Sequence, residues 1–236
     1  MRVLVIPDVH LKPWMFDRAA ELMRSERPDK AVCLMDIPDD WNQEFNLDLY
    51  QKTFKSALEF QKAFPETLWC YGNHDRCYVW DYRESGHSPM AAQTVNEGLR
   101  KLQEALPEID QMTYIHRIDN VLFLHGGLSD SFVTFNTPKK DYNDVDAVIR
   151  YINGLGPRVL WDDESPLWLR PQYNGDRMYK PRKLLQVVGH TPVKQIQKDG
   201  SVITCDVFST YRDGTPIGTQ EYLLIDTETW EYQGIK

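Results

Sequence analysis

The residues Tyr71-Gly72-Asn73-His74-Asp75 follow directly on the apolar run Thr67-Leu68-Trp69-Cys70, which is typical of a short buried strand. The chain turns at Gly72 and then presents an amide, an imidazole and a carboxylate in succession. An amide oxygen can bind a hard cation, and an imidazole gains or loses a proton near neutral pH. Because Gly-Asn pairs are also common in surface turns, the segment indicates a metal-dependent hydrolase only if the rest of the chain supplies partners.

Two apolar runs nearer the N-terminus also end in side chains that can bind a metal. Residues 3–7 are followed by Asp8-Val9-His10, and the alternation of side chains along an extended backbone puts its aspartate and histidine on one side. Residues 31–35 are followed by Asp36-Ile37-Pro38-Asp39, in which the proline fixes the loop between the two carboxylates. Ordinary loop carboxylates and a surface histidine are the alternative interpretation of each segment taken alone.

Helical patterns separate these three strands. Apolar residues recur at helical spacing over residues 14–25 and 47–64, and Asn46 can cap the second of these helices. A third helix is expected over residues 91–106. The order strand, helix, strand, helix, strand is typical of an α/β sheet, in which ligands bind at the carboxyl ends of the strands. We therefore expect the polar strand ends to converge.

The second half of the chain contains two more apolar strands that end in histidine. Residues 121–124 lead into His125-Gly126-Gly127, where the paired glycines let the backbone come close to whatever the histidine contacts. Residues 184–188 lead into Gly189-His190. His116 alternates with apolar neighbours and has no companion of its kind, so we expect it to be structural.

The remaining elements are expected to complete a second sheet. Residues 112–116 are predicted to pair antiparallel with residues 121–124, and a short helix capped by Asn143 is predicted up to residue 153. Antiparallel strands that close the second sheet are predicted over residues 201–204, 221–225 and 229–232. The chain has no internal repeat, low-complexity tract or linker, which favours one domain over residues 1–236.

Composition and charge narrow the class of protein. With 42% hydrophobic and 12% aromatic residues, the composition is that of a globular protein. A net charge of -8 and a pI near 5.3 argue against a partner of duplex nucleic acid. No apolar run reaches the length of a membrane span, and Met1 leads directly into a strand, so we expect no membrane partner, no signal peptide and a cytoplasmic location. The cysteines are too few and scattered for a disulfide framework, and reduced thiols are expected at Cys33, Cys70, Cys77 and Cys205.

The strand ends together supply two carboxylates, one amide and three imidazoles. Such a set can hold two divalent ions with one carboxylate between them, and mixed oxygen and nitrogen ligands suit manganese, iron or zinc. Two ions about 3.5–4 Å apart can bind a phosphate, generate a bridging hydroxide and stabilise an in-line transition state. The candidate ligands are Asp8, His10, Asp36, Asn73, His125 and His190.

The order of these motifs resembles that of the calcineurin-like metallophosphoesterase superfamily. The set Asp-x-His, Asp-x-x-Asp, Gly-Asn-His, His-Gly-Gly-Leu-Ser and Gly-His-Thr-Pro spans residues 8 to 192. It is most similar to the Ser/Thr phosphoprotein phosphatase branch, especially its small bacterial and phage members, and Ser165-Pro166-Leu167-Trp168-x-Arg170 is similar to a segment of that branch. The resemblance implies a four-layer α/β/β/α sandwich, with two mixed β-sheets flanked by helices, and a dimetal centre that hydrolyses phosphate esters.

The resemblance also implies a role for each candidate residue. Asp8, His10 and Asp36 would hold the first metal. Asp36 would bridge to the second, which Asn73, His125 and His190 would also hold. His74 would be the general acid, paired with Asp39. Manganese is the expected metal, with iron, zinc or nickel as alternatives.

The chain departs from the branch at two positions beside the bridging aspartate. Met35 stands where the branch has glycine, and Asp40 stands where it has an arginine that binds the substrate phosphate. Another arginine would have to replace that cation, and the sequence offers Arg76, Arg170 and Arg177. The last two belong to a basic run, residues 170–183, that we expect beside the metal centre.

Three functions are compatible with these motifs. The first is a phosphomonoesterase that works through a metal-bridging hydroxide and acts on a phosphorylated substrate, either a phosphoprotein or a small phosphoester. The second is a hydrolase of nucleotides or dinucleoside polyphosphates, or a phosphodiesterase, on the same centre. The third is an inactive scaffold of the same fold, against which the complete ligand set argues.

Overall fold

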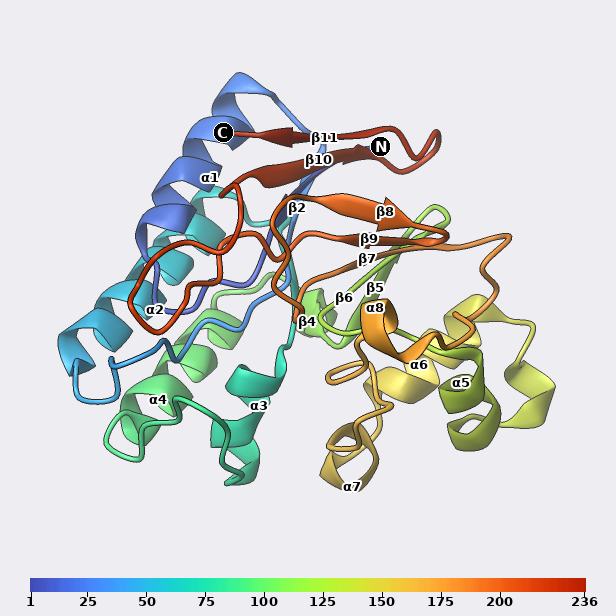
Figure 1. Cartoon of the computed structure of the whole chain (residues 1–236), viewed down its shortest axis with the longest axis horizontal. Coiled ribbons are helices and arrows are strands. Elements are labelled where there is room, and N and C mark those ends of the chain that lie inside the picture. Colours follow the sequence, from blue (N-terminus) through green and yellow to red (C-terminus); the bar gives the residue numbers. More distant parts are fainter.

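The computed structural model describes residues 1–236 apart from the side chain of Asn174. Two mixed sheets lie face to face in the middle of the molecule, with helices outside them (Figure 1). The strand order is β11-β10-β1-β2-β3-β4 in the first sheet and β5-β6-β7-β9-β8 in the second. The predicted sandwich of two mixed sheets flanked by helices is therefore confirmed. The first sheet contains β1 (Arg2–Ile6), β2 (Lys30–Cys33), β3 (Leu68–Cys70), β4 (Met112–Thr113), β10 (Tyr222–Asp226) and β11 (Tyr232–Ile235). The second contains β5 (Ile115–Ile118), β6 (Val121–Leu124), β7 (Leu185–Val188), β8 (Gln197–Asp199) and β9 (Val202–Thr204).

Strand β1 shows why the apolar runs of the sequence are continuous rather than alternating. Val3 and Val5 pack in the cluster between the sheets, together with residues of β6, β7 and β9. Leu4 and Ile6 pack in the larger cluster that includes the helices. Both faces of β1 are therefore buried, as is usual for a strand with parallel and covered neighbours. β1 pairs parallel with β2 and antiparallel with β10.

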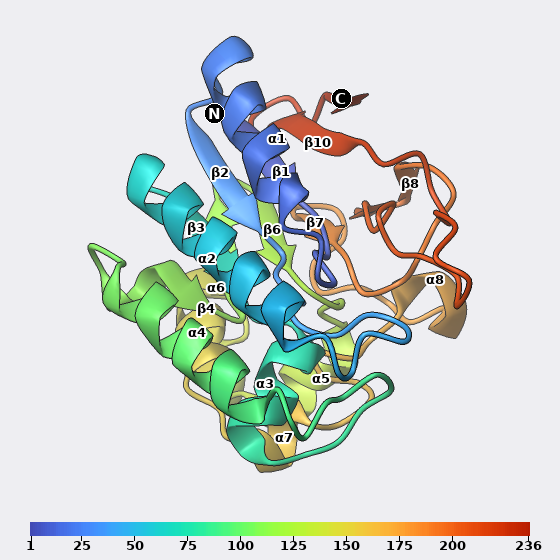
Figure 2. The same ribbon diagram turned by 90° about the vertical axis from the view of Figure 1, so that its left-hand side faces the viewer.

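The helices form the two outer layers. Figure 2 shows α1, α2 and α4 side by side on the outer face of the first sheet, with α3 at its lower edge. The remaining helices lie on the side of the second sheet (Figure 1). The first group consists of α1 (Trp14–Ser25), α2 (Leu47–Ala63), α3 (Asn73–Trp80) and α4 (Ala92–Glu104). The second consists of α5 (Asp130–Asn136), α6 (Val145–Asn153), α7 (Pro157–Leu160) and α8 (Pro171–Asn174). Two short 3₁₀ turns complete the helical elements: η1 (Ile109–Gln111) follows α4 in the chain, and η2 (Lys139–Asp141) follows α5.

Two predictions about strands need correction. Residues 112–116 do not form one strand, because β4 pairs parallel with β3 in the first sheet whereas β5 pairs antiparallel with β6 in the second. The chain passes from one sheet to the other at Tyr114. The C-terminal strands β10 and β11 extend the first sheet beside β1, and only β8 and β9 join the second. β9 is parallel to β7, not antiparallel as predicted.

Two helix starts can be compared with their predicted caps. Asn46 caps α2 as expected, since its side chain accepts a hydrogen bond from Leu49 N at 3.3 Å. The cap of α6 is Asp144 and not Asn143, because the Asp144 carboxylate accepts from Ala147 N at 3.0 Å. An aspartate and an asparagine are equally good caps, so the sequence could not decide between adjacent candidates.

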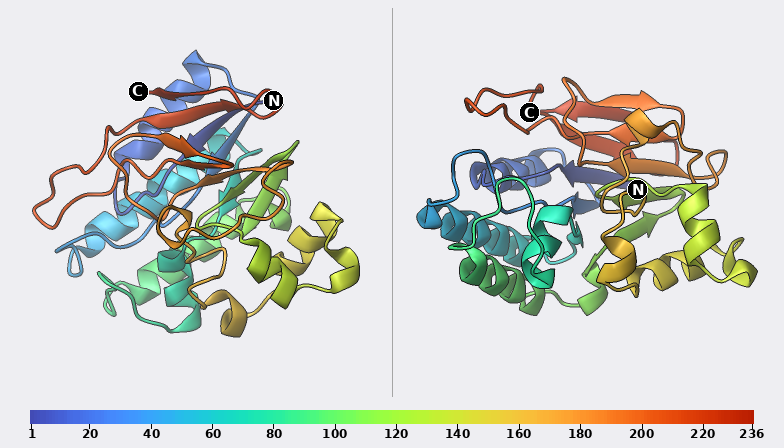
Figure 3. Two further views of the ribbon diagram at one scale, coloured as in Figure 1. Left: turned by 45° about the vertical axis from the view of Figure 1, so that its right-hand side comes forward. Right: turned by 60° about the horizontal axis from the view of Figure 1, so that its bottom comes forward.

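The long segment between β9 and β10 reaches across the end of the sandwich. Figure 3 shows it extending, in orange and red, toward the blue segments that follow β2. The contact is direct, because the indole Nε1 of Trp41 donates to Thr210 O at 3.0 Å. This segment therefore closes one side of the region where the strands of both sheets end.

Candidate active site

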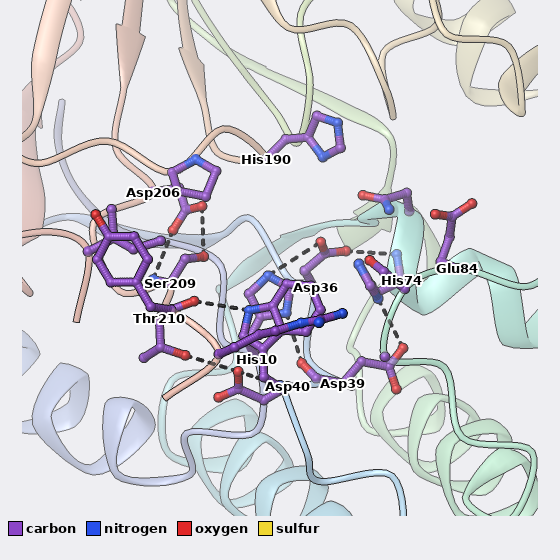
Figure 4. Close-up of a pocket in the computed structure, with 18 of the residues that line it drawn as sticks. His10, Asp36, Asp39, Asp40, His74, Glu84, His190, Asp206, Ser209 and Thr210 are labelled. Carbon is purple, nitrogen blue, oxygen red and sulfur yellow. Dashed lines mark hydrogen bonds and ion pairs between the residues drawn. The ribbon is translucent and has the colours of Figure 1, made fainter. Parts of the chain in front are cut away.

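The ends of five strands meet at a cavity of about 770 Å³. Figure 4 shows His10, Asp36, His74 and His190 around it, although they come from distant parts of the chain. The segments after β1, β2, β3, β7 and β9 all contribute to the lining. The cavity is lined by His10, Asp36, Asp39, Asp40, Trp41, Asn73, His74, Glu84, Ser85, Gly86, Trp168, Arg170, His190, Pro192, Asp206, Ser209, Thr210, Tyr211, Arg212, Asp213 and Ile217.

The six predicted ligands come together in two overlapping groups. In one group, ligand atoms of Asp8, His10 and Asp36 all lie within 4.8 Å of one another, and in the other those of Asp36, His125 and His190 do. Asp36 belongs to both groups. Asn73 adjoins the second group, since its Oδ1 lies 3.0 Å from His125 Nε2. All but His10 are buried.

The donor set fits divalent cations. Asp8 Oδ1 and His190 Nε2 are buried and have no hydrogen-bond partner in the described part of the chain. An unsatisfied buried carboxylate oxygen or imidazole nitrogen is costly, and a cation bound at each of the two groups would remove the cost. His125 Nδ1 lies 3.0 Å from Leu34 O, which fixes the ring with Nε2 toward Asp36 at 3.2 Å.

The charge states of two imidazoles favour cation binding, whereas Asp36 and Asp8 outweigh burial and raise the pKa of His125 to about 9, so its proton must leave before it binds a metal. Burial lowers the pKa of His10 and, together with the nearby His125, lowers the pKa of His190 well below its usual range. Both imidazoles are therefore neutral, which is the form that binds a metal. Burial alone would raise the pKa of Asp36, but the imidazoles of His125 and His74 outweigh it and hold the pKa far below normal. Burial and the neighbouring carboxylates of Asp206 and Asp36 raise the pKa of Asp8, and they outweigh the lowering effect of His125.

Two glycines let the backbone pass close to the carboxylates of Asp36 and Asp8. A Cβ atom on Gly72 would lie 2.0 Å from Asp36 Oδ1, and one on Gly189 would lie 1.9 Å from Asp8 Oδ1. Any other residue at either position would displace the carboxylate. The sequence placed both glycines next to ligands but did not reveal that each contacts a different ligand, far away in the chain.

The departure at Met35 has a visible consequence. Met35 and Asp36 have φ angles of 57° and 42°, in the left-handed region that favours glycine. The branch that the chain resembles has glycine at the first of these positions, and this conformation explains why. His10, Asp39 and His190 also have positive φ, so the backbone around the cavity is held in an unusual conformation by its surroundings.

His74 and Asp39 form a pair at the edge of the metal-ligand groups. His74 Nδ1 lies 2.9 Å from Asp39 Oδ2, and the other carboxylate oxygen accepts from the hydroxyls of Tyr50 and Tyr78. Burial would lower the pKa of His74, but Asp36 and Asp39 outweigh it and raise the pKa to about 9. The imidazole therefore carries a proton at neutral pH, as a general acid must.

Two buried carboxylates at the site were missed. Asp75 accepts hydrogen bonds from Asp36 N and Gly72 N, both at 2.9 Å, and from Ile37 N at 3.1 Å. It therefore ties the loop that carries Asp36 to the start of α3. Asp206 lines the cavity and accepts from the Ser209 hydroxyl at 2.9 Å. Asp206 could have been found from the sequence, since it follows an apolar strand as the candidate ligands do.

The predicted arginines are separated by the structure. Arg170 lines the cavity, and its Nη1 donates to His190 O at 2.6 Å and to Thr191 Oγ1 at 3.3 Å. Arg76 points away from the cavity into a separate hollow, where its guanidinium lies 4.6 Å from the ring centre of Tyr71 and 4.5 Å from that of Trp80.

Of the described residues in the basic run, residues 170–183, only Arg170 lines the cavity. Arg177 lies outside it, where its carbonyl accepts from Asp130 N at 2.8 Å. The expectation that the run as a whole lies beside the metal ligands therefore does not hold. The sequence showed that these basic residues follow one another, but not that the chain turns away from the site at Pro171, where α8 begins.

Comparisons with known proteins agree with this geometry. The family model for calcineurin-like phosphoesterases matches residues 1–213. A cold-active protein-tyrosine phosphatase of a psychrophilic Shewanella species is similar in fold, with a TM-score of 0.57 and 16% identity over 100% of this chain and 80% of that one. A mutant of a cold-active protein tyrosine phosphatase gives a TM-score of 0.55 at 17% identity, again over 100% and 80%.

Two further findings bear on the class of protein. The comparison with curated proteins gives no significant match. In the part of the chain that the structure describes, no helix has both the length and the apolar character needed to cross a membrane. The family match covers most of the 236 residues and every strand end of the cavity. The chain thus belongs to the calcineurin-like phosphoesterase family, whose members are enzymes that hydrolyse phosphate esters at a metal centre.

Proposed function

We propose that this enzyme is a phosphomonoesterase that uses two divalent ions, with manganese as the preferred metal. Asp8, His10 and Asp36 would hold one ion, and Asp36, Asn73, His125 and His190 the other. The observation that carries the proposal is that the two groups share Asp36 and adjoin a protonated His74 paired with Asp39.

The protein's own groups would bind the ester and handle its proton. When bound, two divalent ions supply charge neutralisation and an activated water for in-line attack on phosphorus. His74 uses Nδ1 to contact Asp39, which leaves Nε2 to donate a proton to the departing ester oxygen. Asp39 keeps the imidazole oriented and charged, and the hydroxyls of Tyr50 and Tyr78 hold Asp39 in turn.

The proton donor supports the hydrolysis of esters whose leaving group is basic. An alkoxide that leaves from phosphorus is a poor leaving group, so a raised pKa of about 9 at His74 suits the hydrolysis of seryl, threonyl or other alkyl phosphates. The cavity of about 770 Å³ has room for an organic group beside the phosphate. The tyrosine phosphatase named above supports the fold at 16% identity, and the type of phosphorylated side chain is left to experiment.

A substrate panel tests the proposal. Purified protein is stripped with a chelator, reloaded with manganese, iron, zinc or nickel, and assayed on phosphopeptides, mononucleotides, dinucleoside tetraphosphates, cyclic nucleotides and bis-p-nitrophenyl phosphate. We expect about two ions per chain and the highest kcat/KM on a monoester. Higher kcat/KM on a diester or a dinucleoside polyphosphate would favour the alternative reaction on the same centre, and full activity after chelation would exclude the metal-dependent mechanism.

A further inference from the structure

The residue at position 40 has a different task here from the one that the family resemblance implies. Asp40 accepts a hydrogen bond from Lys12 Nζ at 3.0 Å with one oxygen, and from Thr210 Oγ1 at 3.1 Å and its neighbour Trp41 N at 2.8 Å with the other. Its negative charge is thus balanced by a nearly buried lysine and cannot bind a phosphate. Asp40 instead fastens the segment that contains Thr210.

We call residues 206–218 the Arg212 loop, and its backbone is fixed against residues 40–42. Trp41 Nε1 donates to Thr210 O at 3.0 Å, and Asn42 Nδ2 donates to Arg212 O at 2.9 Å. Within the loop, Ile217 N donates to Ser209 O at 2.9 Å. These contacts set the position from which the Arg212 side chain leaves the backbone.

The Arg212 side chain is placed at the cavity by an aromatic ring. Its guanidinium carbon lies 5.0 Å from the ring centre of Trp41, and both side chains line the cavity. A cation over an indole face is held by the ring's electrostatic quadrupole. The carboxylate of the adjacent Asp213 is turned to Thr215, from which it accepts two hydrogen bonds at 2.9 and 2.7 Å, so it does not compete for the guanidinium.

Positive charge is scarce in this cavity. Of the described residues that line it, only Arg170 and Arg212 carry a permanent positive charge. Arg170 already uses Nη1 to hold the His190 carbonyl and the Thr191 hydroxyl. A phosphate monoester is a dianion at neutral pH, and the carboxylates around it would repel it without cations on the side away from the metal ligands. The lining carboxylates are Asp36, Asp39, Asp40, Glu84, Asp206 and Asp213.

We propose that Arg212 binds the phosphate of the substrate and so replaces the arginine that is missing at position 40. The two positions lie side by side, because Trp41 follows Asp40 in the chain and also contacts the guanidinium of Arg212. The cation therefore comes from a different part of the chain but reaches the same side of the cavity. Arginine suits the task, since its donors match two phosphate oxygens. This inference rests on the phosphoesterase function proposed above.

Binding of inorganic phosphate to metal-loaded protein tests the inference without turnover. Calorimetric titrations compare wild type with Arg212→Ala, Arg212→Lys and, as a control, Arg182→Ala, since Arg182 is exposed and does not line the cavity. We expect the Kd for phosphate to rise about tenfold in Arg212→Ala, partly recover in Arg212→Lys and stay unchanged in Arg182→Ala. Metal content and Tm should be unchanged in all of them.

The other outcomes separate the two proposals. A Kd for phosphate in Arg212→Ala within twofold of wild type would overturn the role of Arg212. If in addition the KM for a phosphopeptide rises, Arg212 contacts the organic group of the substrate and not the phosphate. If wild type binds phosphate and Arg212→Ala does not, but wild type hydrolyses no ester, the proposed function fails and the assignment of Arg212 stands. If metal-loaded wild type does not bind phosphate but hydrolyses a monoester, the assignment of Arg212 is overturned and the proposed function stands.

Discussion

His74 is the residue whose environment is most specialised for chemistry. Because its proton is needed only when the leaving group is basic, His74→Asn should lose about 10²-fold or more in kcat on an alkyl or seryl phosphate. On p-nitrophenyl phosphate the loss should be much smaller, since nitrophenolate leaves without help. Asp39→Asn should show the same pattern more weakly, because it changes only the orientation and charge of the imidazole.

Steady-state kinetics on both substrates, together with metal analysis, check this prediction. Equal losses on the two substrates would mean that His74 positions the phosphate and that the acid is another group. Loss of metal in His74→Asn would instead make His74 a ligand.

Asp36 is the one carboxylate that both ligand groups share. Asp36→Asn should therefore release both ions and lower kcat/KM by more than about 100-fold, the upper range for removing a group that only supports a ligand. Asp8→Asn is the matched variant, because it belongs to one group only and should release one ion. Metal analysis by mass spectrometry distinguishes the two, and two retained ions in Asp36→Asn would contradict the shared role.

His116 illustrates a histidine that acts on stability and not on chemistry. It is buried in β5, its Nε2 contacts Trp69 O at 3.1 Å, and burial lowers its pKa to about 4. The unfolded chain, with an ordinary pKa near 6.5, takes up this proton first. The contribution of His116 to the free energy of unfolding is therefore complete above pH 6.5 and is lost as the pH falls toward 4, by an amount on the order of 3 kcal/mol.

Urea unfolding at pH 7.5 and pH 5 measures this loss. The difference between the two pH values should be smaller in His116→Gln than in wild type, and the other titrating groups cancel in that comparison. An identical difference in both proteins would show that His116 is protonated, or accessible to water, in the folded state.

At the scale of single residues, the sequence indicated which side chains would converge better than it indicated what each of them contacts. All six candidate ligands were recognisable because each follows an apolar strand, and they converge although up to 182 positions separate them, as between Asp8 and His190. Arg76 was misplaced because its partners, the rings of Tyr71 and Trp80, have no sequence signature for holding a cation. Arg212 was missed because its position depends on hydrogen bonds that Trp41 and Asn42 make to the backbone of its loop.

The turns that follow the strands tolerate substitution as poorly as the candidate ligands do. Gly189, between β7 and His190, faces Asp8 so closely that an added Cβ would overlap the carboxylate. Gly189→Ala should therefore displace Asp8, release an ion and lower kcat/KM by more than about 100-fold, with a loss of about 1–3 kcal/mol in the free energy of unfolding. Gly156→Ala is the control, because no atom lies within 4 Å of its added Cβ. Normal metal content in Gly189→Ala would show that the turn can shift without cost.

Whole elements were predictable where a pattern was long and one-sided. The helix expected over residues 14–25 matches α1 at both ends, since four of its apolar residues form one buried face. The split of residues 112–116 between two sheets was not predictable, because alternation shows that a strand has buried faces but not which sheet it joins. The same limit explains why β10 and β11 were expected in the wrong sheet.

The stability of the whole molecule depends on C-terminal residues that lie outside the candidate active site. The family match ends at residue 213, yet β10 lies in the first sheet beside β1 and buries Leu223 and Ile225 between the sheets. A chain that ends at Gly218 retains every candidate ligand, but we expect it to be insoluble or unfolded because β1 would become an apolar edge. A chain that ends at Glu231 loses only the largely exposed β11 and should keep its circular dichroism and activity. Soluble, active protein from the shorter chain would show that β10 is dispensable.

The pairing of β1 with β10 also determines when the first sheet can be completed on the ribosome. Residues 2–6 emerge first, and their antiparallel partner at residues 222–226 emerges after more than 200 further residues. At a translation rate of about 5–20 residues per second, this interval is on the order of 10 to 45 seconds. During that time β1 has β2 on one side and an unpaired, strongly apolar edge on the other. The nascent chain should therefore depend on a chaperone that covers this edge more than its length alone suggests.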